Sequence, residues 1–368
     1  MKIKIPNYLL ELDEKEYIKK GSDSIRVYHI GYIIKKIYSE LKEFKSIEII
    51  ENESKRCHQT YSGWILERGG TSIQDLYRIL QYWKVTCKKT DKDLENLWEE
   101  IYSISNYFGC VNGKRVKLPK YLDNQLSYLL GVIMGDGHLA NPNKSYDRLT
   151  SYNSELRITD GHKETFVKLS KIFEELFGYK PKIYSELSKT NKPFYRFVIR
   201  SKPIHRFLMN ICQIPTGKKY DKTDIPKIIK DSPLEIQKSF IVGFFDADGC
   251  LRLHREKFPM VTISQLNPQI LYSIIEVSKM LNIKWSGPYR SNHPRNKGYQ
   301  IKITNKENLE RFLKEFPSLN PIKIKQSGIL WKMLNPRLIS PSKWMVIEGG
   351  EQKTKETLSR DTSKVQKL

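Results

Sequence analysis

The sequence is poor in cysteine and lacks long apolar runs. Its 368 residues include five cysteines, an odd number, widely separated and without paired Cys-x-x-Cys spacing. This pattern excludes a disulfide framework and a cysteine zinc site, and it predicts reduced thiols in a cytosolic protein. No apolar run is long enough to cross a bilayer, and residues 1–4 have no signal-peptide pattern. We therefore expect a soluble cytoplasmic protein with no membrane partner.

Acidic residues are scarce relative to basic ones. The chain has 64 Lys and Arg against 41 Asp and Glu, a formal net charge of +23 and a pI near 9.6. An excess of this size, taken as spread along the whole chain, fits a polyanionic partner, of which nucleic acid is the commonest. A Lys-rich, solvated surface typical of a thermophilic or AT-rich genome is the alternative. Charge alone does not distinguish DNA from RNA.

Two segments of the chain share one pattern. Residues 129–137 (LLGVIMGDG) and 241–249 (IVGFFDADG) are apolar runs with a central Gly and an Asp-Gly end. A Gly inside a helix costs about 1 kcal/mol relative to Ala, so its presence in both copies predicts close contact between two helix backbones. The terminal Gly predicts a helix stop. Asp-Gly alone is a common turn dipeptide, but two copies in matching context favour a functional interpretation.

Helix-start signals precede both segments at a suitable distance. Asp123 is a candidate N-cap before the first, and residues 232–235 (SPLE) form a candidate capping box before the second. Asp136 and Asp248 are thereby expected at helix C-termini, where the helix dipole disfavours a carboxylate. Two acids brought together at such ends require a cation.

The paired segments resemble the two motifs of single-chain LAGLIDADG homing endonucleases. Residues 246–249 match the family signature closely. The first copy departs from it, with Met134 and Gly135 where the family often has Asp and Ala, but it retains Asp136. The resemblance implies a monomeric, site-specific endonuclease that cuts long asymmetric sites in double-stranded DNA and leaves 3′ overhangs.

The sequence that follows each motif also repeats. A strand and a helix, two further strands and another helix follow in each half, which predicts pseudo-twofold symmetry within one polypeptide. The resemblance implies an α+β fold with the motif helices at the centre and two antiparallel β-saddles that hold DNA. The matching segments are 155–159 and 260–264, 162–177 and 268–281, 182–184 and 284–286, 195–199 and 299–303, and 206–208 and 311–313.

Four regions are expected along the chain. Residues 1–115 form a mainly helical domain, residues 116–230 and 231–339 form the two repeats, and residues 340–368 form a polar, disordered tail. The short basic linker 113–120 joins the first domain to the repeats.

Part of the first domain resembles another DNA-binding structure. Residues 60–80 are similar to the third and fourth helices of a lambda-repressor-type helix-turn-helix, with Ser72 as an N-cap and Asp75 at its third helical position. The resemblance implies that residues 59–68 approach a major groove. An ordinary helical hairpin packed on the catalytic domain is the alternative.

The strands carry candidate DNA-binding residues. In residues 250–254, Leu251 and Leu253 alternate with Arg252 and His254, which predicts one buried and one solvated face. For each candidate, an exposed charge without a specific role is the alternative. The candidates are Arg157, Arg196, Arg200, Arg252, His254 and Lys302 in the strands, with Gln59 and Arg68 in the helix-turn-helix segment.

The resemblance also implies the chemistry of the site. Divalent ions bound by Asp136 and Asp248, with the backbones of Gly135 and Ala247, would activate water and neutralise developing charge, on a two-metal pattern. Hard oxygen ligands favour Mg²⁺, with Mn²⁺ as a substitute. A basic residue is expected near each metal, and the matching positions are Lys325 and Lys219, with Lys222 as a second choice.

Two other functions share this scaffold. Family members can act as RNA maturases in intron splicing, although the chain has no evident aromatic stacking motif for single-stranded RNA. Some DNA-binding regulators pair the scaffold with a helix-turn-helix, but they have typically lost the acids. An intein is disfavoured, because the sequence begins at Met1 and ends at Lys367-Leu368, without the residues that splicing domains have at their ends.

Overall fold

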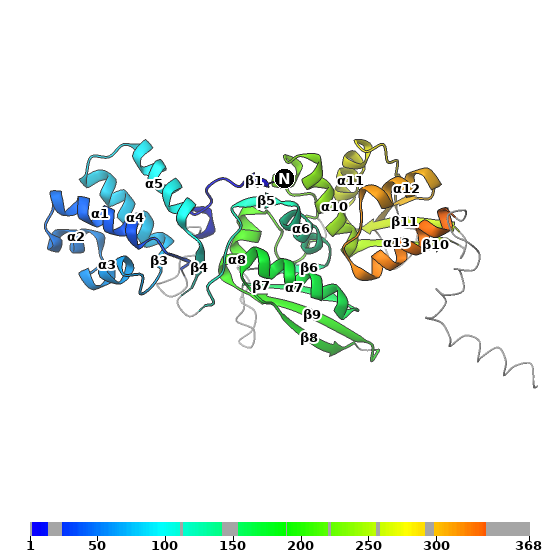
Figure 1. The fold of residues 1–368 in the computed structure, drawn as a ribbon, viewed down its shortest axis with the longest axis horizontal. Helices are drawn as coiled ribbons and strands as arrows, with labels where there is room; N and C mark the ends of the chain where they lie inside the picture. Colours follow the sequence, from blue (N-terminus) through cyan, green and yellow to red (C-terminus); the bar gives the residue numbers. More distant parts are fainter. Residues whose placement is uncertain are drawn as a thin grey trace, which may run out of the picture.

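The computed structural model describes residues 2–13, 24–110, 113–141, 154–188, 190–219, 222–254, 258–290 and 298–335. The expected tail at 340–368 lies outside the described residues. Figure 1 shows an elongated molecule with a helical module at one end and two α+β halves beside it. In the described residues, no helix combines the length and apolar character needed to cross a membrane.

Two helices pack against each other at the centre of the two halves. They are α6 (Asn124–Asp136) and α10 (Leu234–Asp248). A Cβ built at Gly131 would lie 2.0 Å from the Phe240 carbonyl oxygen, and one at Gly243 would lie 1.9 Å from the Tyr128 carbonyl oxygen. The predicted contact between helix backbones is thus confirmed, since only glycine permits this approach.

The helix starts agree with the sequence-based expectation in one half only. The Asp123 side chain accepts a hydrogen bond from the Leu126 N–H at 3.0 Å, as an N-cap should. The expected capping box at α10 is wrong, because Pro233 occupies the N-cap position. The Ser232 hydroxyl instead donates to the Ile228 carbonyl oxygen at 2.6 Å.

Each half contains a four-stranded antiparallel sheet with the same strand order. The first has the order β6-β7-β9-β8 and the second the order β10-β11-β13-β12. The registers also correspond, since Gly137 is opposite Ile158 and Gly249 is opposite Ile263. The predicted duplication is therefore confirmed. The strands are β6 (Gly137–Leu139), β7 (Glu155–Asp160), β8 (Lys182–Leu187), β9 (Pro193–Arg200), β10 (Gly249–His254), β11 (Phe258–Gln265), β12 (Ser286–Arg290) and β13 (Tyr299–Ile303).

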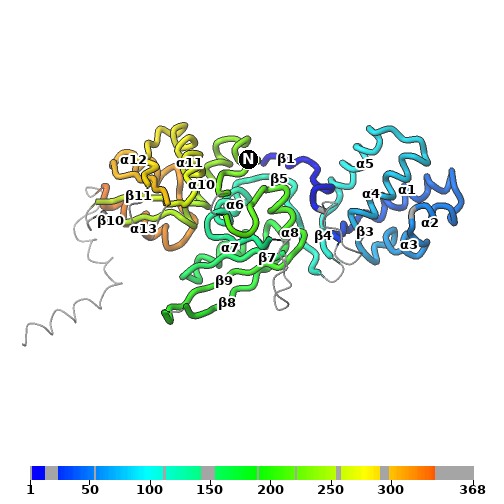
Figure 2. The backbone as a smooth tube through the Cα atoms, turned by 180° about the vertical axis from the view of Figure 1, so that it is seen from behind, coloured from blue at the N-terminus to red at the C-terminus, as the bar shows by residue number. Residues whose placement is uncertain are grey.

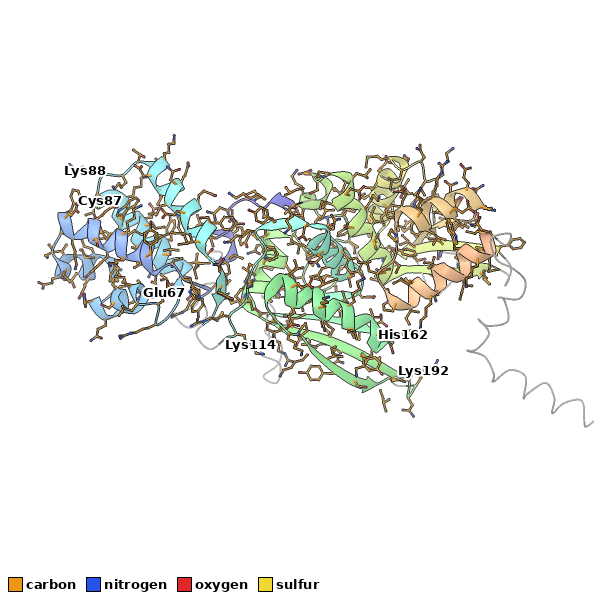
Figure 3. All side chains as sticks on the ribbon, in the orientation of Figure 1. Glu67, Cys87, Lys88, Lys114, His162 and Lys192 are labelled. Carbon is orange, nitrogen blue, oxygen red and sulfur yellow. The ribbon has the colours of Figure 1, made fainter. Side chains whose placement is uncertain are left out.

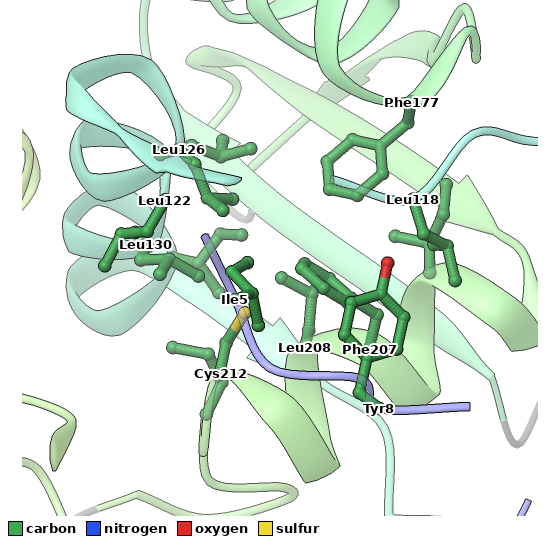
Figure 4. Close-up of a cluster of buried hydrophobic side chains, with 14 of the residues drawn as sticks. Ile5, Tyr8, Leu118, Leu122, Leu126, Leu130, Phe177, Phe207, Leu208 and Cys212 are labelled. Atoms are coloured by element: carbon green, nitrogen blue, oxygen red, sulfur yellow. The ribbon is translucent and has the colours of Figure 1, made fainter. Parts of the chain in front are cut away.

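Helices outside the central pair bury apolar side chains against the sheets. In the first half, the cluster in Figure 4 joins Leu126 and Leu130 of α6 to Phe177 and Phe207. Figure 3 shows Lys192 at the tip of the β8–β9 hairpin, which extends beyond the helices. The helices are α7 (Lys163–Phe177), α8 (Lys202–Arg206), the π-helical turn η3 (Phe207–Ile211), α9 (Lys227–Lys230), α11 (Gln269–Lys279), α12 (Lys306–Glu315) and α13 (Pro321–Leu334).

The N-terminal module is mainly helical, as predicted, but it also contains a small sheet with strand order β3-β2-β4. Its strand β3 lies between the two helices of the helix-turn-helix-like segment. Ser72 is the N-cap of the second, and its hydroxyl accepts from the Asp75 N–H at 3.0 Å. The elements are α1 (Gly31–Phe44), α2 (Ile47–Ser54), α3 (His58–Ile65), α4 (Ile73–Thr86), α5 (Asp91–Ile104), β2 (Arg26–Tyr28), β3 (Thr71–Ser72) and β4 (Tyr107–Gly109).

The first residues of the chain lie against the first repeat. Strand β1 (Lys2–Lys4) pairs with β5 (Tyr121–Asp123), as Figure 2 shows, and the short helix η1 (Glu11–Asp13) follows. The Tyr8 ring packs edge-on against the Phe207 ring, with 5.3 Å between the ring centroids. The Tyr8 hydroxyl donates to the Pro119 carbonyl oxygen at 2.9 Å. Residues 2–13 also contact helix α5 of the module, since the Tyr102 hydroxyl donates to the Ile5 carbonyl oxygen at 3.1 Å. They thus lie against both the module and the first repeat, and the domain boundary at residue 115 stays a prediction.

The basic linker contacts both parts that it joins. Arg115 lies over the Tyr28 ring at 4.3 Å, and Lys114 lies over the Tyr179 ring at 5.6 Å. Val116 pairs with Phe108 in an isolated β-bridge. The linker is therefore packed between the module and the first repeat.

The contact between α6 and α10 leads to a stability prediction. We expect Gly243→Ala to lower the free energy of unfolding by about 3 kcal/mol or more, because the added methyl meets a backbone carbonyl that has no free space to move into. Chemical denaturation of the purified protein measures the change.

Gly328→Ala in α13 is the matched control. No described atom lies within 4 Å of a Cβ at Gly328. This substitution should be neutral or should stabilise by up to about 1 kcal/mol through helix propensity. Equal effects of the two substitutions would contradict the proposed backbone contact.

Candidate active site

The acids of the two motifs converge where the central helices end. Asp136 is the last residue of α6 and Asp248 the last of α10. A Cβ built at Gly135 would lie 2.4 Å from the Ala247 Cβ and 3.1 Å from Asp248 Oδ2. The Asp248 carboxylate of one half thus lies against the helix that carries the Asp136 carboxylate of the other.

The pKa values of both acids are raised. Burial raises the pKa of Asp136 to about 7, with further contributions from the negative charges of Asp248 and Asp160. Burial also raises the pKa of Asp248, against the opposing effects of Lys219 and of Gln265, whose Nε2 donates to Asp248 Oδ2 at 2.6 Å. Two half-buried carboxylates that repel each other make a site where a cation would be stabilised.

A lysine lies at the C-terminus of each central helix, and Lys323 is buried whereas Lys219 is half-buried. Lys219 Nζ donates to the carbonyl oxygens of Ile133, Met134 and Gly135, at 3.0, 2.7 and 2.9 Å. Lys323 Nζ donates to the carbonyl oxygens of Phe245 and Asp246, the latter at 2.9 Å. Phe245 and Asp246 follow Ile133 and Met134 by 112 positions, the spacing that also separates Asp136 from Asp248. The two lysines are therefore equivalent under the pseudo-twofold symmetry.

Burial lowers the pKa of both lysines. That of Lys219 falls to about 8, against the opposing effect of Asp248 and Asp136. Burial also lowers the pKa of Lys323, and the negative charges of Asp246, Asp136 and Asp248 oppose that shift. Each lysine therefore brings a polarised N–H group to the acid pair at near-neutral pH.

The sequence-based choice of Lys325 is corrected by this geometry. Lys325 is exposed on α13, whereas Lys323 is buried at the helix end. Two residues on a helix differ by about 200° in direction, so the side chains of Lys323 and Lys325 leave opposite faces. Lys219 follows Pro215 by four positions, as Lys325 follows Pro321, but only the second proline begins a helix. Lys222, the second choice in the first half, is exposed.

A pocket of about 530 Å³ lies beside Asp248. Its lining includes Gln265, which the sequence analysis did not single out, together with Met134, Gly135, His138, Lys219 and Asp248. The strand registers place Asp160 at the position equivalent to Gln265, two residues beyond Ile158 and Ile263. The repeated pattern in the sequence could have pointed to Asp160 and Gln265. Only the strand pairing shows that the two occupy equivalent positions.

The donor set fits a hard divalent cation with part of its coordination left open. In the described residues, no cluster of three or more His, Cys, Asp or Glu side chains could bind a metal. Mg²⁺ is commonly bound by one or two carboxylates together with water and substrate phosphate oxygens, so two acids suffice. The Gly135 carbonyl oxygen accepts from Lys219, and the proposed metal contacts of Gly135 and Ala247 stay predictions.

The basic candidates of the first sheet are paired with acids. Arg157 and Arg200 both bond Glu155, at 2.5 and 2.9 Å, and Arg196 bonds Glu186 at 2.6 Å. A phosphate group would have to compete with these carboxylates for the three arginines.

The candidates of the second sheet have different surroundings. Arg252 is exposed on β10, and Lys302 lies over the Tyr289 ring at 5.4 Å. His254 ends β10, and its side chain lies outside the description. DNA contact by any of the six strand residues stays a prediction.

The net positive charge is not spread evenly along the chain, contrary to expectation. Residues 1–104 contain 18 Lys and Arg against 17 Asp and Glu, so nearly all of the excess belongs to residues 105–368. Gln59 on α3 and Arg68 in the turn after it are exposed. Their contact with a major groove stays a prediction.

The geometry defines a class of protein: a duplicated α+β scaffold in which two acids and two lysines meet at the ends of paired helices. Residues 235–317 match the sequence model of the LAGLIDADG-like domain. The second repeat, with the motif that ends at Asp248, therefore contains a LAGLIDADG-like domain.

Individual proteins also resemble parts of the chain. It is 29% identical over 158 residues to the homing endonuclease I-ApeI of Aeropyrum pernix. This alignment covers 42% of this chain and 68% of that protein. The chain is 28% identical over 208 residues to a probable translation initiation factor IF-2 of Methanocaldococcus jannaschii, over 54% of this chain but only 15% of that protein. The structure of I-DmoI with DNA and Ca aligns with a TM-score of 0.41 and 20% identity, over 56% of this chain and 96% of that one.

The raised pKa of Asp136 leads to a prediction about stability. Because the folded protein binds this proton more tightly than the unfolded chain, the free energy of unfolding should fall as pH rises from about 4 to about 7. Without metal at pH 8, Asp136→Asn should therefore stabilise the protein by about 2 kcal/mol. Denaturation at pH 5 and pH 8 measures this effect.

Two comparisons test the cause of this stabilisation. The advantage of Asp136→Asn should fall at pH 5 to about a third of its value at pH 8, because the native carboxyl is protonated there while most unfolded chains have already lost the proton. Asp231→Asn, which removes a carboxylate from an exposed ion pair with Lys227, is the control and should change stability by less than about 0.5 kcal/mol at either pH. An equal gain at both pH values would contradict the proposed charge repulsion.

Proposed function

We propose that this chain is a site-specific double-strand DNA endonuclease that uses divalent metal ions bound by Asp136 and Asp248. The observation that carries the proposal is the convergence of these two acids with Lys219 and Lys323 at the ends of two helices in backbone contact. Mg²⁺ is the expected ion and Mn²⁺ a substitute. When bound, the ions would neutralise charge on the scissile phosphate and lower the pKa of the attacking water.

The side chains of the site divide the remaining tasks. The two carboxylates supply hard oxygen ligands and lose their mutual repulsion when a cation binds. Lys219 and Lys323 each present an ammonium group beside the acids and stabilise negative charge that develops on a phosphate. With its pKa lowered to about 8, Lys219 is also suited to exchange a proton near neutral pH. Gln265, bonded to Asp248, restricts the orientation of that carboxylate.

The substrate follows from charge and symmetry. The excess of positive charge in the part of the chain that contains the two sheets suits a DNA backbone. The two strands of a duplex are related by a local twofold axis, and the pseudo-twofold repeat offers one set of catalytic side chains to each strand. The halves differ at equivalent positions, as with Asp160 and Gln265, so the target site should be asymmetric. We expect a monomer that leaves 3′ overhangs.

The first test is metal-dependent cleavage. Genomic DNA of the source organism is incubated with the protein and Mg²⁺, Mn²⁺ or EDTA, and the new ends are mapped by sequencing. We expect cutting at few sites with either metal and none with EDTA. Asp136→Asn and Asp248→Asn should each abolish double-strand cutting and retain DNA binding, because each removes a metal ligand.

The alternatives give different results in the same experiment. Tight DNA binding without cutting under any condition would favour a regulator. If the chain instead bound structured intron RNA and promoted splicing without cutting DNA, the maturase interpretation would replace the nuclease.

The two lysines of α13 provide a second prediction. Lys323→Met should lower the cleavage rate by about 10²-fold, in the range seen when one charge-stabilising group is lost. Lys325→Met removes the same charge from the exposed side of the helix and should have little effect on the rate. Single-turnover cleavage of a mapped site measures both. A larger loss for Lys325→Met would contradict the assignment of Lys323.

A further inference from the structure

The second motif contains an acid that the proposed chemistry does not use. Asp246 lies two residues before Asp248 and is buried in the core between the halves. Its Oδ2 accepts hydrogen bonds from the Tyr128 hydroxyl and from the N–H groups of Leu319 and Asn320, at 2.9, 2.8 and 2.9 Å. Its Oδ1 accepts from the Ser318 hydroxyl at 2.5 Å. A carboxylate with four donors is fixed in orientation.

Three of these donors belong to the turn that begins α13. Asn320 is the N-cap of that helix, and its side chain accepts from the Ile322 N–H at 2.9 Å. Lys323 lies in the first turn of the same helix. A carboxylate at a helix start also interacts favourably with the helix dipole. Asp246 therefore fixes the position from which Lys323 extends.

Lys323 returns to the helix that carries Asp246. Its Nζ donates to the carbonyl oxygens of Phe245 and Asp246. Two sets of hydrogen bonds thus join the end of α10 to the start of α13. The turn at 318–320 donates to the Asp246 side chain, and Lys323 donates to the α10 backbone. A shift of that turn would move the ammonium group away from the acid pair.

The described residues of the first half contain no counterpart of this arrangement. The residue equivalent to Asp246 is Met134, which is buried and has no hydrogen-bonding carboxylate. Lys219 lies in a loop, where the Thr223 hydroxyl donates to the Lys219 carbonyl oxygen at 2.8 Å. The two equivalent lysines are thus supported by different structures, a carboxylate-bound helix start in one half and a loop in the other.

We propose that Asp246 is a positioning residue that aligns Lys323 but not Lys219, so that loss of its carboxylate impairs cleavage of one DNA strand. The inference rests on the proposed nuclease function, in which each half of the pseudo-twofold site serves one strand. Asp246 acts on the reaction only through Lys323.

The test is strand-resolved cleavage by Asp246→Asn. The amide keeps the volume of the side chain, but it loses negative charge and offers an N–H group to a site filled with donors. We expect a nicked intermediate, in which the strand also impaired by Lys323→Met is cut about 10²-fold more slowly, as expected for a catalytic group displaced by about 1 Å. Lys219→Met should impair the opposite strand. A duplex labelled differently on each strand measures both rates.

Two controls separate positioning from a general loss of structure. Tyr128→Phe removes one donor from Asp246 and leaves the turn at 318–320 in place, so the two strands should be affected equally. Met134→Leu changes the equivalent position of the first half and should likewise show no strand bias. Equal slowing of both strands by Asp246→Asn, or a bias toward the strand that depends on Lys219, would overturn the proposal.

A second measurement decides the inference if the native chain does not cut DNA. Carbon-13 labelling of lysine side chains gives NMR signals for the Cε atoms of Lys219 and Lys323, assigned with the two Met variants. Asp246→Asn should shift the signal of Lys323 and leave that of Lys219 unchanged. No shift, or equal shifts of both, would refute the positioning role, whereas absent cleavage by the native chain would refute only the nuclease proposal.

Discussion

The contact between the backbones of α6 and α10 is the constraint on which the rest of the structure depends. Gly131 and Gly243 allow each helix to approach the carbonyl oxygens of the other, and this approach brings both helix ends to one place. The acids, the lysines that bond the last carbonyl groups and the first strands of both sheets all start from those ends. Any side chain larger than hydrogen at these glycines would separate the acids as well as the helices.

The close approach of the two helix ends brings Asp136 and Asp248 together at an electrostatic cost, which other groups of the site partly offset. The two half-buried carboxylates repel each other, and Lys219 and Lys323 offset this repulsion while donating to carbonyl groups at the helix ends. The remaining cost is what makes the site suitable for a cation and for a phosphate group. Stability and function therefore depend on the same charges in opposite ways.

The two sheets share one strand order, but the helices and side chains around them differ between the halves. Strand order and register correspond between the halves, yet Asp160 stands where the other half has Gln265, and Met134 where it has Asp246. The lysines converge on equivalent positions from a loop and from a helix. A symmetric scaffold thus supports two sets of side chains that differ in chemistry, which suits an asymmetric DNA site.

The sequence by itself determined the repeat, the two acids and the need for glycine between the helices, because these depend on local pattern and on spacing along the chain. It also predicted the N-caps Asp123 and Ser72, which act within three residues. Only the tertiary structure decided that Lys323 and not Lys325 reaches the site, since that depends on where α13 begins and which face it turns inward. It likewise showed that residues 2–13 contact both the first repeat and helix α5 of the N-terminal module. Such contacts join residues far apart in the chain, and spacing along the sequence does not specify them.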